Sequence, residues 1–233
     1  MTTEQIISEL RTLGADSTKR IFLNHGAPAA CLGVKVEDLK KIQKKVKKDH
    51  ALSLSLYSTG IPDAQYLAGL IADEKKISKN DLQHWVENAS WYMLSEYTVP
   101  WIAAESQYGW ELALDWIDDG RASVQSSGWA TLASLVSIKE NEGLDLKTLK
   151  SLLGRVEKRI AGAPNRVRYA MNGFVIATGG YVDALRDEAL RVGKAVGKVE
   201  VEMGKTACKV PYAPDYIRKM AEKGMKKKKM ARC

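Results

Sequence analysis

Apolar residues recur with helical spacing along most of the chain. Between residues 64 and 71 they occupy the positions i, i+3, i+4 and i+7 (Ala64, Leu67, Ala68 and Ile71), and stretches 149–160 and 182–196 show the same spacing. In stretch 36–48, lysines fill the positions between the apolar residues. This pattern is typical of amphipathic α-helices that bury one face in a core.

Short turn signals separate these helical stretches. They are Gly60–Asp63, Asp119-Gly120, Asn141–Gly143 and Gly162–Pro164. Only residues 198–203 alternate as a strand does, and one such segment cannot form a sheet, so we interpret it as an extended loop. The chain is therefore predicted to be all-α, with about ten to twelve helices joined by short loops.

Three of the expected helices resemble one another. Trp91, Trp129 and Phe174 follow each other at intervals of 38 and 45 residues. Spacings near 40 residues suit the two-helix repeats of HEAT-like solenoids. We therefore predict a curved stack of antiparallel helix pairs, with a concave face on which an extended partner would bind.

Most of the net positive charge lies at the C-terminal end. The chain carries a formal charge of +8, of which residues 218–233 contribute +7 through eight basic residues and one acid. We therefore divide the chain into one solenoid domain, 1–217, and a basic, flexible tail, 218–233. Such a tail would be attracted to the phosphates of a polyanion. A solvated tail that only aids solubility is the alternative.

Several classes of protein are disfavoured by the sequence. No apolar run is long enough for a membrane-spanning helix, and residues 1–14 lack the apolar block of a signal peptide, so we expect a cytoplasmic protein. The three cysteines and three histidines form no zinc or redox pattern, and no glycine-rich phosphate loop is present. We expect no metal and no organic cofactor.

The segment 89–100 has the most suggestive chemistry. It is predicted to be one helix of about three turns that ends at Pro100. Tyr92 and Glu96 are four residues apart and share a face, with Trp91 beside them. Aromatic rings next to a lone carboxylate suit a flat, positively charged group. The alternative is that both rings belong to the core and that Glu96 is a surface acid.

Arg166 and Arg168 lie at the start of a helix that follows Pro164. Free N–H groups at a helix start bind phosphate, and arginine adds charge and bidentate geometry. These two residues are therefore candidate contacts to a DNA backbone. The alternative is surface ion pairing with Glu157 or Asp183.

Several segments together resemble the AlkD-type DNA alkylation repair proteins, which are HEAT-like DNA glycosylases. The segments are 32–41, 61–68, the Trp91–Pro100 helix, 165–174 and 203–211. The resemblance implies a protein, expected to be a monomer, that hydrolyses the N-glycosidic bond of cationic N3- or N7-alkylated purines in duplex DNA. Such chemistry needs no metal and no cofactor.

The resemblance also implies roles for individual residues. Glu96 would be the catalytic carboxylate that stabilises the developing sugar cation, and Trp91, Tyr92 and Phe174 would lie against the lesion or the DNA. The family's pattern has aspartate where Glu96 stands, a second tryptophan where Tyr92 stands, and an arginine where Gly128 stands. A non-catalytic DNA-binding scaffold and a protein-interaction solenoid are therefore alternative hypotheses.

Overall fold

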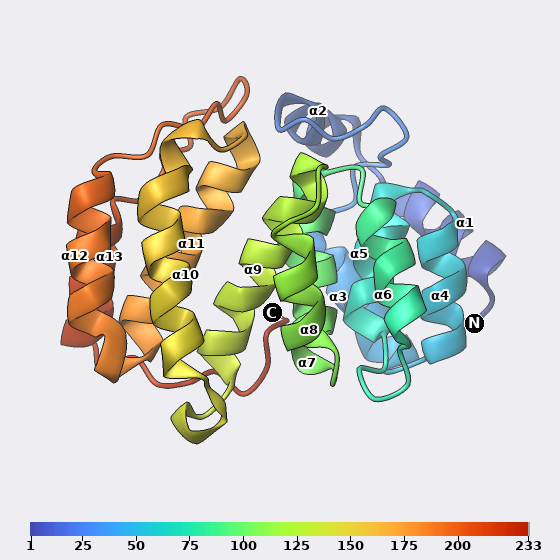
Figure 1. Cartoon of the computed structure of the whole chain (residues 1–233). Coiled ribbons are helices and arrows are strands. Elements are labelled where there is room, and N and C mark those ends of the chain that lie inside the picture. The colour runs from blue at the N-terminus through green and yellow to red at the C-terminus, as the bar shows by residue number, and fades with distance from the viewer. Residues whose placement is uncertain (233) are drawn as a thin grey trace.

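The computed structural model describes residues 1–232. Helices account for all the regular secondary structure in this range, which confirms the predicted all-α class (Figure 1). The thirteen α-helices are α1 (Thr3–Leu13), α2 (Asp16–Asn24), α3 (Val36–Val46), α4 (His50–Ser58), α5 (Pro62–Ile71), α6 (Lys79–Glu87), α7 (Val99–Glu105), α8 (Gly109–Trp116), α9 (Ala122–Ile138), α10 (Leu146–Arg159), α11 (Asn165–Tyr181), α12 (Arg186–Val196) and α13 (Ala213–Glu222). Four short elements accompany them: the π-helix η1 (Leu94–Thr98) and the 3-10 turns η2 (Asn141–Gly143), η3 (Ile160–Gly162) and η4 (Asp183–Leu185).

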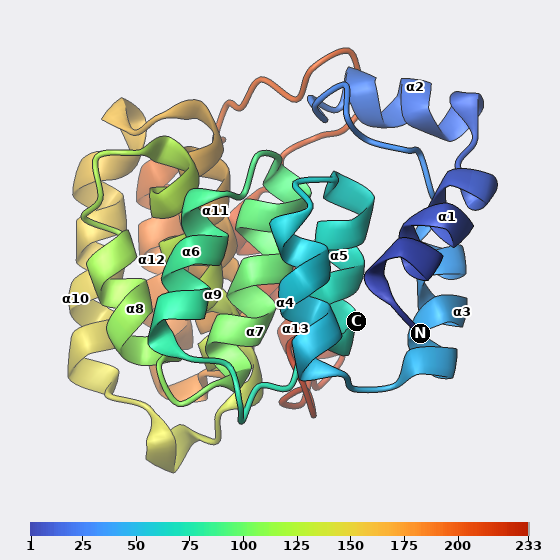
Figure 2. The ribbon, with the colours of Figure 1, turned by 90° about the vertical axis from the view of Figure 1, so that its right-hand side faces the viewer.

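From α4 onward the helices form antiparallel pairs stacked side by side in two layers (Figure 2). Helices α5, α7, α9, α11 and α13 contact one another in sequence, with η1 between α5 and α9, and make the inner layer. Helices α4, α6, α8, α10 and α12 pack behind them as the outer layer. This is the predicted solenoid of helix pairs.

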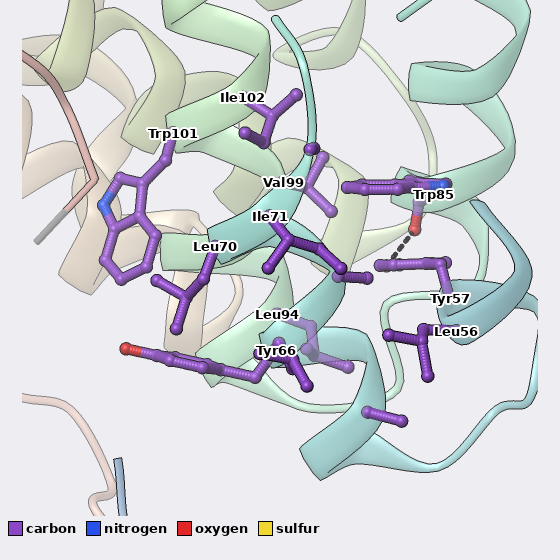
Figure 3. Packing of buried hydrophobic residues seen from close by; sticks show 14 of the residues in the cluster. Leu56, Tyr57, Tyr66, Leu70, Ile71, Trp85, Leu94, Val99, Trp101 and Ile102 are labelled. Atoms are coloured by element: carbon purple, nitrogen blue, oxygen red, sulfur yellow. Dashed lines mark hydrogen bonds between the residues drawn. The ribbon is translucent and has the colours of Figure 1, made fainter. Parts of the chain in front are cut away.

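The core fills the space between the two layers. Most of its residues are aliphatic or aromatic and fully buried. In the first half of the stack, Tyr57 lies flat on Trp85, with ring centroids 4.2 Å apart, and its hydroxyl donates a hydrogen bond of 2.7 Å to the Trp85 carbonyl (Figure 3). The aromatic ring therefore enters the core without leaving its hydroxyl unpaired.

Helices α8 and α9 approach each other closely at Gly128. A Cβ atom at this position would lie 2.7 Å from the backbone nitrogen of Ile117 and 2.9 Å from the carbonyl oxygen of Ala113. Only glycine fits there without moving a helix. An arginine at position 128, as in the pattern of the resembled family, is therefore incompatible with this packing.

The prediction of one helix ending at Pro100 is wrong. The π-helix η1 continues directly into α7, and Pro100 lies in the first turn of α7. Proline has no N–H with which to bond the carbonyl of Ser95, five residues earlier, as a π-turn would require. The Ser127 hydroxyl of α9 donates to that carbonyl instead, at 2.5 Å. The helix therefore passes the proline without leaving this buried acceptor unpaired.

The prediction of a flexible tail from residue 218 also fails. Residues 218–222 belong to α13, and residues 223–232, which we call the C-terminal strap, run back across the inner layer to α7 (Figure 1). The backbone N–H of Lys228 donates to the Ser137 carbonyl at 2.8 Å, and those of Ala231 and Arg232 donate to Glu105. The basic composition of the strap favours full solvation, but Arg232 is buried and pairs with Glu74 and Glu105.

The extended loop predicted for residues 198–203 is confirmed, and it is part of a longer segment, 197–212, that forms no helix or strand. This segment joins α12 to α13 but passes beside α2, at the other end of the stack (Figure 2). Gly204 has a φ of +71°, and a Cβ there would lie 2.5 Å from the Asn24 carbonyl oxygen. The loop therefore contacts the N-terminal part of the molecule.

Within residues 1–232, no helix is long and apolar enough to cross a membrane.

Candidate functional site

The most unusual feature of the inner layer is an ion pair between Glu96, which is buried, and Arg166, which is half-buried. The two residues are 70 positions apart and come from η1 and from the first turn of α11. Arg166 Nε donates to Glu96 Oε1 at 2.7 Å, and Nη2 donates to Oε2 at 2.5 Å. Only 3% of the Glu96 side chain is exposed. This bidentate geometry occupies both carboxylate oxygens.

Two tyrosine rings enclose the Arg166 guanidinium. Its central carbon lies 4.4 Å from the ring centre of Tyr92 and 4.6 Å from that of Tyr169. Both rings thus interact with the cation through their faces. The third nitrogen, Nη1, donates to the Met203 sulfur at 3.4 Å. The predicted shared face of Tyr92 and Glu96 is confirmed, and the flat cation that it holds is the protein's own arginine.

The loop 197–212 supports this arrangement from one side. The side-chain amide of Asn165 donates to the Glu202 carbonyl at 2.9 Å, and its oxygen accepts the Glu202 N–H at 2.7 Å. These two bonds place Met203 next to Arg166. The site is therefore built from η1, α11 and the loop.

Burial and charge act in opposite directions on the ion pair. Burial raises the pKa of Glu96, because it disfavours the carboxylate, and the hydrogen bonds and charge of Arg166 counteract that rise. Burial alone would lower the pKa of Arg166, but Glu96 raises it above its ordinary value. Arg166 thus stays charged, and its positive charge weakens the attraction of the Glu96 carboxylate for any second cation in the groove.

The inner layer has a groove of about 280 Å³ that begins at Glu96. Its walls carry the aromatic side chains Tyr97, Trp101, Tyr169 and Tyr181, and small residues of α9 and α11 form much of the remainder. Glu96 borders the groove near the N-terminal end of α11, and Lys228 of the C-terminal strap borders it near the C-terminal end. A second hollow of about 310 Å³ lies on the other side of Tyr92 and Arg166, beneath the loop 202–204.

The other predicted site residues are not gathered at the ion pair. Trp91 is buried against Phe22, with ring centroids 5.1 Å apart, and its Nε1 donates to the His25 carbonyl at 2.9 Å. It still lines the second hollow with one edge. Trp91 therefore fixes the start of the η1 segment to the region of α2.

The prediction that Phe174 contacts DNA is wrong. Its side chain is fully buried, and its ring packs against Trp129 with centroids 5.4 Å apart. It lies at a core position of α11, where the helix faces α9. The regular spacing of Trp129 and Phe174 therefore indicates core packing and not a ligand-binding surface.

Arg166 and Arg168 point to different surroundings. The partner of Arg166 is Glu96, and the suggested partners Glu157 and Asp183 pair with Arg191 and Arg186 instead. Arg168 lines a separate hollow of about 250 Å³ with residues 196 and 198–200, and its Nε has no hydrogen-bond partner among residues 1–232. Because an α-helix turns by more than half a revolution over two residues, the two arginine side chains point in opposite directions and do not contact the same phosphate.

Several contributors were not found from the sequence. Tyr169, Met203 and Asn165 complete the surroundings of Arg166, and Asp63 holds the loop before α3 by accepting the N–H groups of Leu32 and Val34. Within residues 1–232, no cluster of three His, Cys, Asp or Glu side chains could hold a metal ion, and Cys31 and Cys208 are free thiols. Cys233 lies outside the described residues.

The fold and the site together define a HEAT-like solenoid whose inner face carries a buried acid next to aromatic rings. The family model described as "DNA alkylation repair enzyme" matches residues 6–217, and the chain belongs to this family. The predicted resemblance is thereby confirmed at the level of the family.

Individual relatives agree with this assignment. Two uncharacterized proteins, from Listeria innocua and Listeria monocytogenes, are each 33% identical over 225 residues, covering 94% of this chain and 97% of their own. A solved structure described as "A new family of proteins related to the HEAT-like repeat DNA glycosylases with affinity for branched DNA structures" superimposes with a TM-score of 0.91 at 32% identity. The match covers all of both chains. Family and fold together support a role in DNA repair or DNA binding.

Proposed function

We propose that the protein binds branched DNA on the inner face of its solenoid and does not cleave the glycosidic bond. The observation that carries this proposal is the Glu96–Arg166 ion pair. A carboxylate that stabilises a developing sugar cation must face that cation with an unpaired oxygen. Here both oxygens of Glu96 are held by Arg166, and the side chain is 3% exposed.

Breaking the pair to free the acid would be costly. Removing one member of a buried ion pair typically costs about 3–5 kcal/mol, because the other charge stays buried without a partner. A substrate would have to supply that energy before any chemistry. The site is thus better suited to holding helices η1 and α11 at a fixed separation than to acting on a base.

The inner groove itself suits nucleic acid at a branch point. Tyr97 and Tyr169 are half-buried on its walls and offer part of their rings to bases that have left the helical stack. Trp101 and Tyr181 are buried and support these walls from the core. Lysines of the C-terminal strap supply positive charge at one border. A solved relative is described as having affinity for branched DNA, which supports the same partner for this chain.

The test compares equilibrium binding of the protein to a three-way junction, a four-way junction and a duplex of matched length and composition, by fluorescence anisotropy at one salt concentration. We expect tighter binding to the junctions, by about tenfold or more, since a stacking surface adds about 1–3 kcal/mol per unstacked base. Equal affinities for junction and duplex would contradict the proposal.

Excision of N3- or N7-alkylated purines is the second candidate function. It is favoured by membership of the DNA alkylation repair enzyme family and by the position of Glu96 at the border of an aromatic groove. Incubation with methylated duplex DNA, followed by measurement of free 3-methyladenine and 7-methylguanine, tests it directly. Release by the wild type that disappears in Glu96→Gln would establish excision and refute the non-catalytic proposal.

A further inference from the structure

The C-terminal strap ends in a buried anchor. Arg232 is the last residue that the structure describes, and 3% of its side chain is exposed. Its Nε donates to Glu105 at 2.8 Å, Nη1 donates to the Ala72 carbonyl at 2.8 Å, and Nη2 donates to Glu74 at 2.5 Å. Glu105 also accepts the N–H groups of Ala231 and Arg232. The buried charge is therefore fully paired.

This anchor gives a lysine-rich segment a defined path. Lys227 turns inward, where its ammonium donates to the Val136 carbonyl at 2.7 Å, and Glu140 and Asp183 lie within reach of its charge. The backbone of Lys228 is held by Ser137 at 2.8 Å. The strap is thus fixed to the C-terminal end of α9 and to α7, where carbonyl groups and acids favour cations.

Four lysines of the strap are exposed. Lys223 directly follows α13, and Lys226, Lys228 and Lys229 lie further along the strap; within residues 1–232 none of them forms an ion pair. The Lys228 ammonium lies 6.0 Å from the Tyr181 ring centre, at the border of the aromatic groove. Lys228 therefore lies at the groove, with Lys226 and Lys229 close to it along the strap.

We infer that the C-terminal strap is a fixed phosphate-binding element that holds one backbone of a DNA branch beside the inner groove, with Arg232 as its positioning residue. This inference rests on the proposed function, because it names the part of the protein that contacts the partner. A mobile lysine tail would bind any DNA by charge alone. A row of lysines at a fixed place next to a stacking surface selects DNA whose backbone passes that place, and therefore raises the preference for a branch over a duplex.

The first test removes the charges. In the variant K226Q/K228Q/K229Q we expect binding to a three-way junction to weaken by about tenfold or more. The slope of log affinity against log salt concentration should fall by about 0.9 for each lost phosphate contact. The matched control, K44Q/K147Q/K150Q, removes the same charge from exposed lysines of α3 and α10 and should change junction binding far less. Equal effects of the two triple variants would overturn the inference.

The second test keeps the three lysines but releases the strap. Arg232→Gln removes one buried cation, and Glu105→Gln weakens the same anchor without changing any lysine. Both variants should retain duplex affinity and lose most of the preference for the junction. A junction preference that is unchanged in both would mean that the fixed path is irrelevant. A rise in affinity would mean that the strap blocks the groove, and either result overturns the inference.

The two proposals fail in different ways. If the wild type does not prefer junctions over duplex, the proposed function fails. If the wild type does prefer them and the strap variants bind as the wild type does, only the role of the strap fails.

Discussion

Two largely buried arginine–carboxylate sites within residues 1–232 differ in construction. Arg166 meets one acid, Glu96, and its remaining surface is covered by tyrosine rings and a methionine sulfur. Arg232 meets two acids and a backbone carbonyl at 2.8 Å. The first joins two helices of the folded stack, whereas the second anchors a segment that has no regular secondary structure. The same chemistry therefore serves as a joint between two helices in one place and as the anchor of an irregular segment in the other.

The largest effect is expected for Arg166→Ala. This change leaves Glu96 buried without a partner, because η1 cannot move away from the core, and should lower the free energy of unfolding by about 3–5 kcal/mol. Urea denaturation followed by tryptophan fluorescence measures it. The double variant Glu96→Gln, Arg166→Met should recover most of the loss, since no buried charge remains. An Arg166→Ala variant as stable as wild type would show that the pair is not a joint.

A smaller loss is expected for Arg232→Ala. The strap can detach and let Glu105 regain water, so we expect a loss of about 1–3 kcal/mol, the range for losing buried hydrogen bonds. The same denaturation experiment, together with limited proteolysis of the C-terminal end, checks this. A loss as large as that of Arg166→Ala would remove the distinction between joint and anchor.

The anchor also makes stability depend on pH through Glu74. Burial opposes its ionisation, but hydrogen bonds from Lys48 and its own backbone and the charges of Arg232 and Lys48 lower the pKa of Glu74 from 4.5 to about 2. A carboxyl whose pKa is lowered by folding stabilises the protein above its ordinary pKa, and this contribution is lost as the pH falls from 4.5 towards 2. The difference in melting temperature between wild type and Glu74→Gln should therefore shrink over that range. Glu157→Gln, at an exposed pair with Arg191, is the control and should show a smaller change.

The smallest effect concerns the tyrosines around Arg166. Tyr169→Leu keeps an apolar cover but removes the ring face, and should cost about 0.5–1 kcal/mol, the range of an exposed cation–π contact. In the Arg166→Met background the same substitution should cost less, and the double-mutant cycle measures the difference. Identical costs in both backgrounds would mean that the ring acts only by packing.

Helical spacing predicted the fold class and the paired helices well, because each repeat buries an apolar stripe that is visible in the sequence. It also placed Tyr92 and Glu96 on one face. Sequence reasoning could not pair Glu96 with Arg166, since a contact between residues 70 positions apart leaves no local signal. The predictions of a DNA contact for Phe174 and of a flexible tail at residues 223–232 are wrong for a related reason. An aromatic ring or a basic residue is compatible with either a surface or a buried place, and tertiary packing decides which.

The π-turn of η1 changes which side chains share a face along this helix. Its wider turn inserts about one residue relative to an α-helix and rotates all later residues by about 100°. Tyr92 and Tyr97 are five residues apart and yet neighbours, with ring centroids 6.4 Å apart, while Tyr97 and Trp101 keep the ordinary spacing of four at 5.9 Å. Residues before and after the π-turn therefore face different directions. Glu96 faces α11, whereas Trp101 and Ile102 pack in the core of the first repeats. Deleting one residue from η1 would therefore either turn Glu96 away from α11 or move Trp101 and Ile102 out of the core.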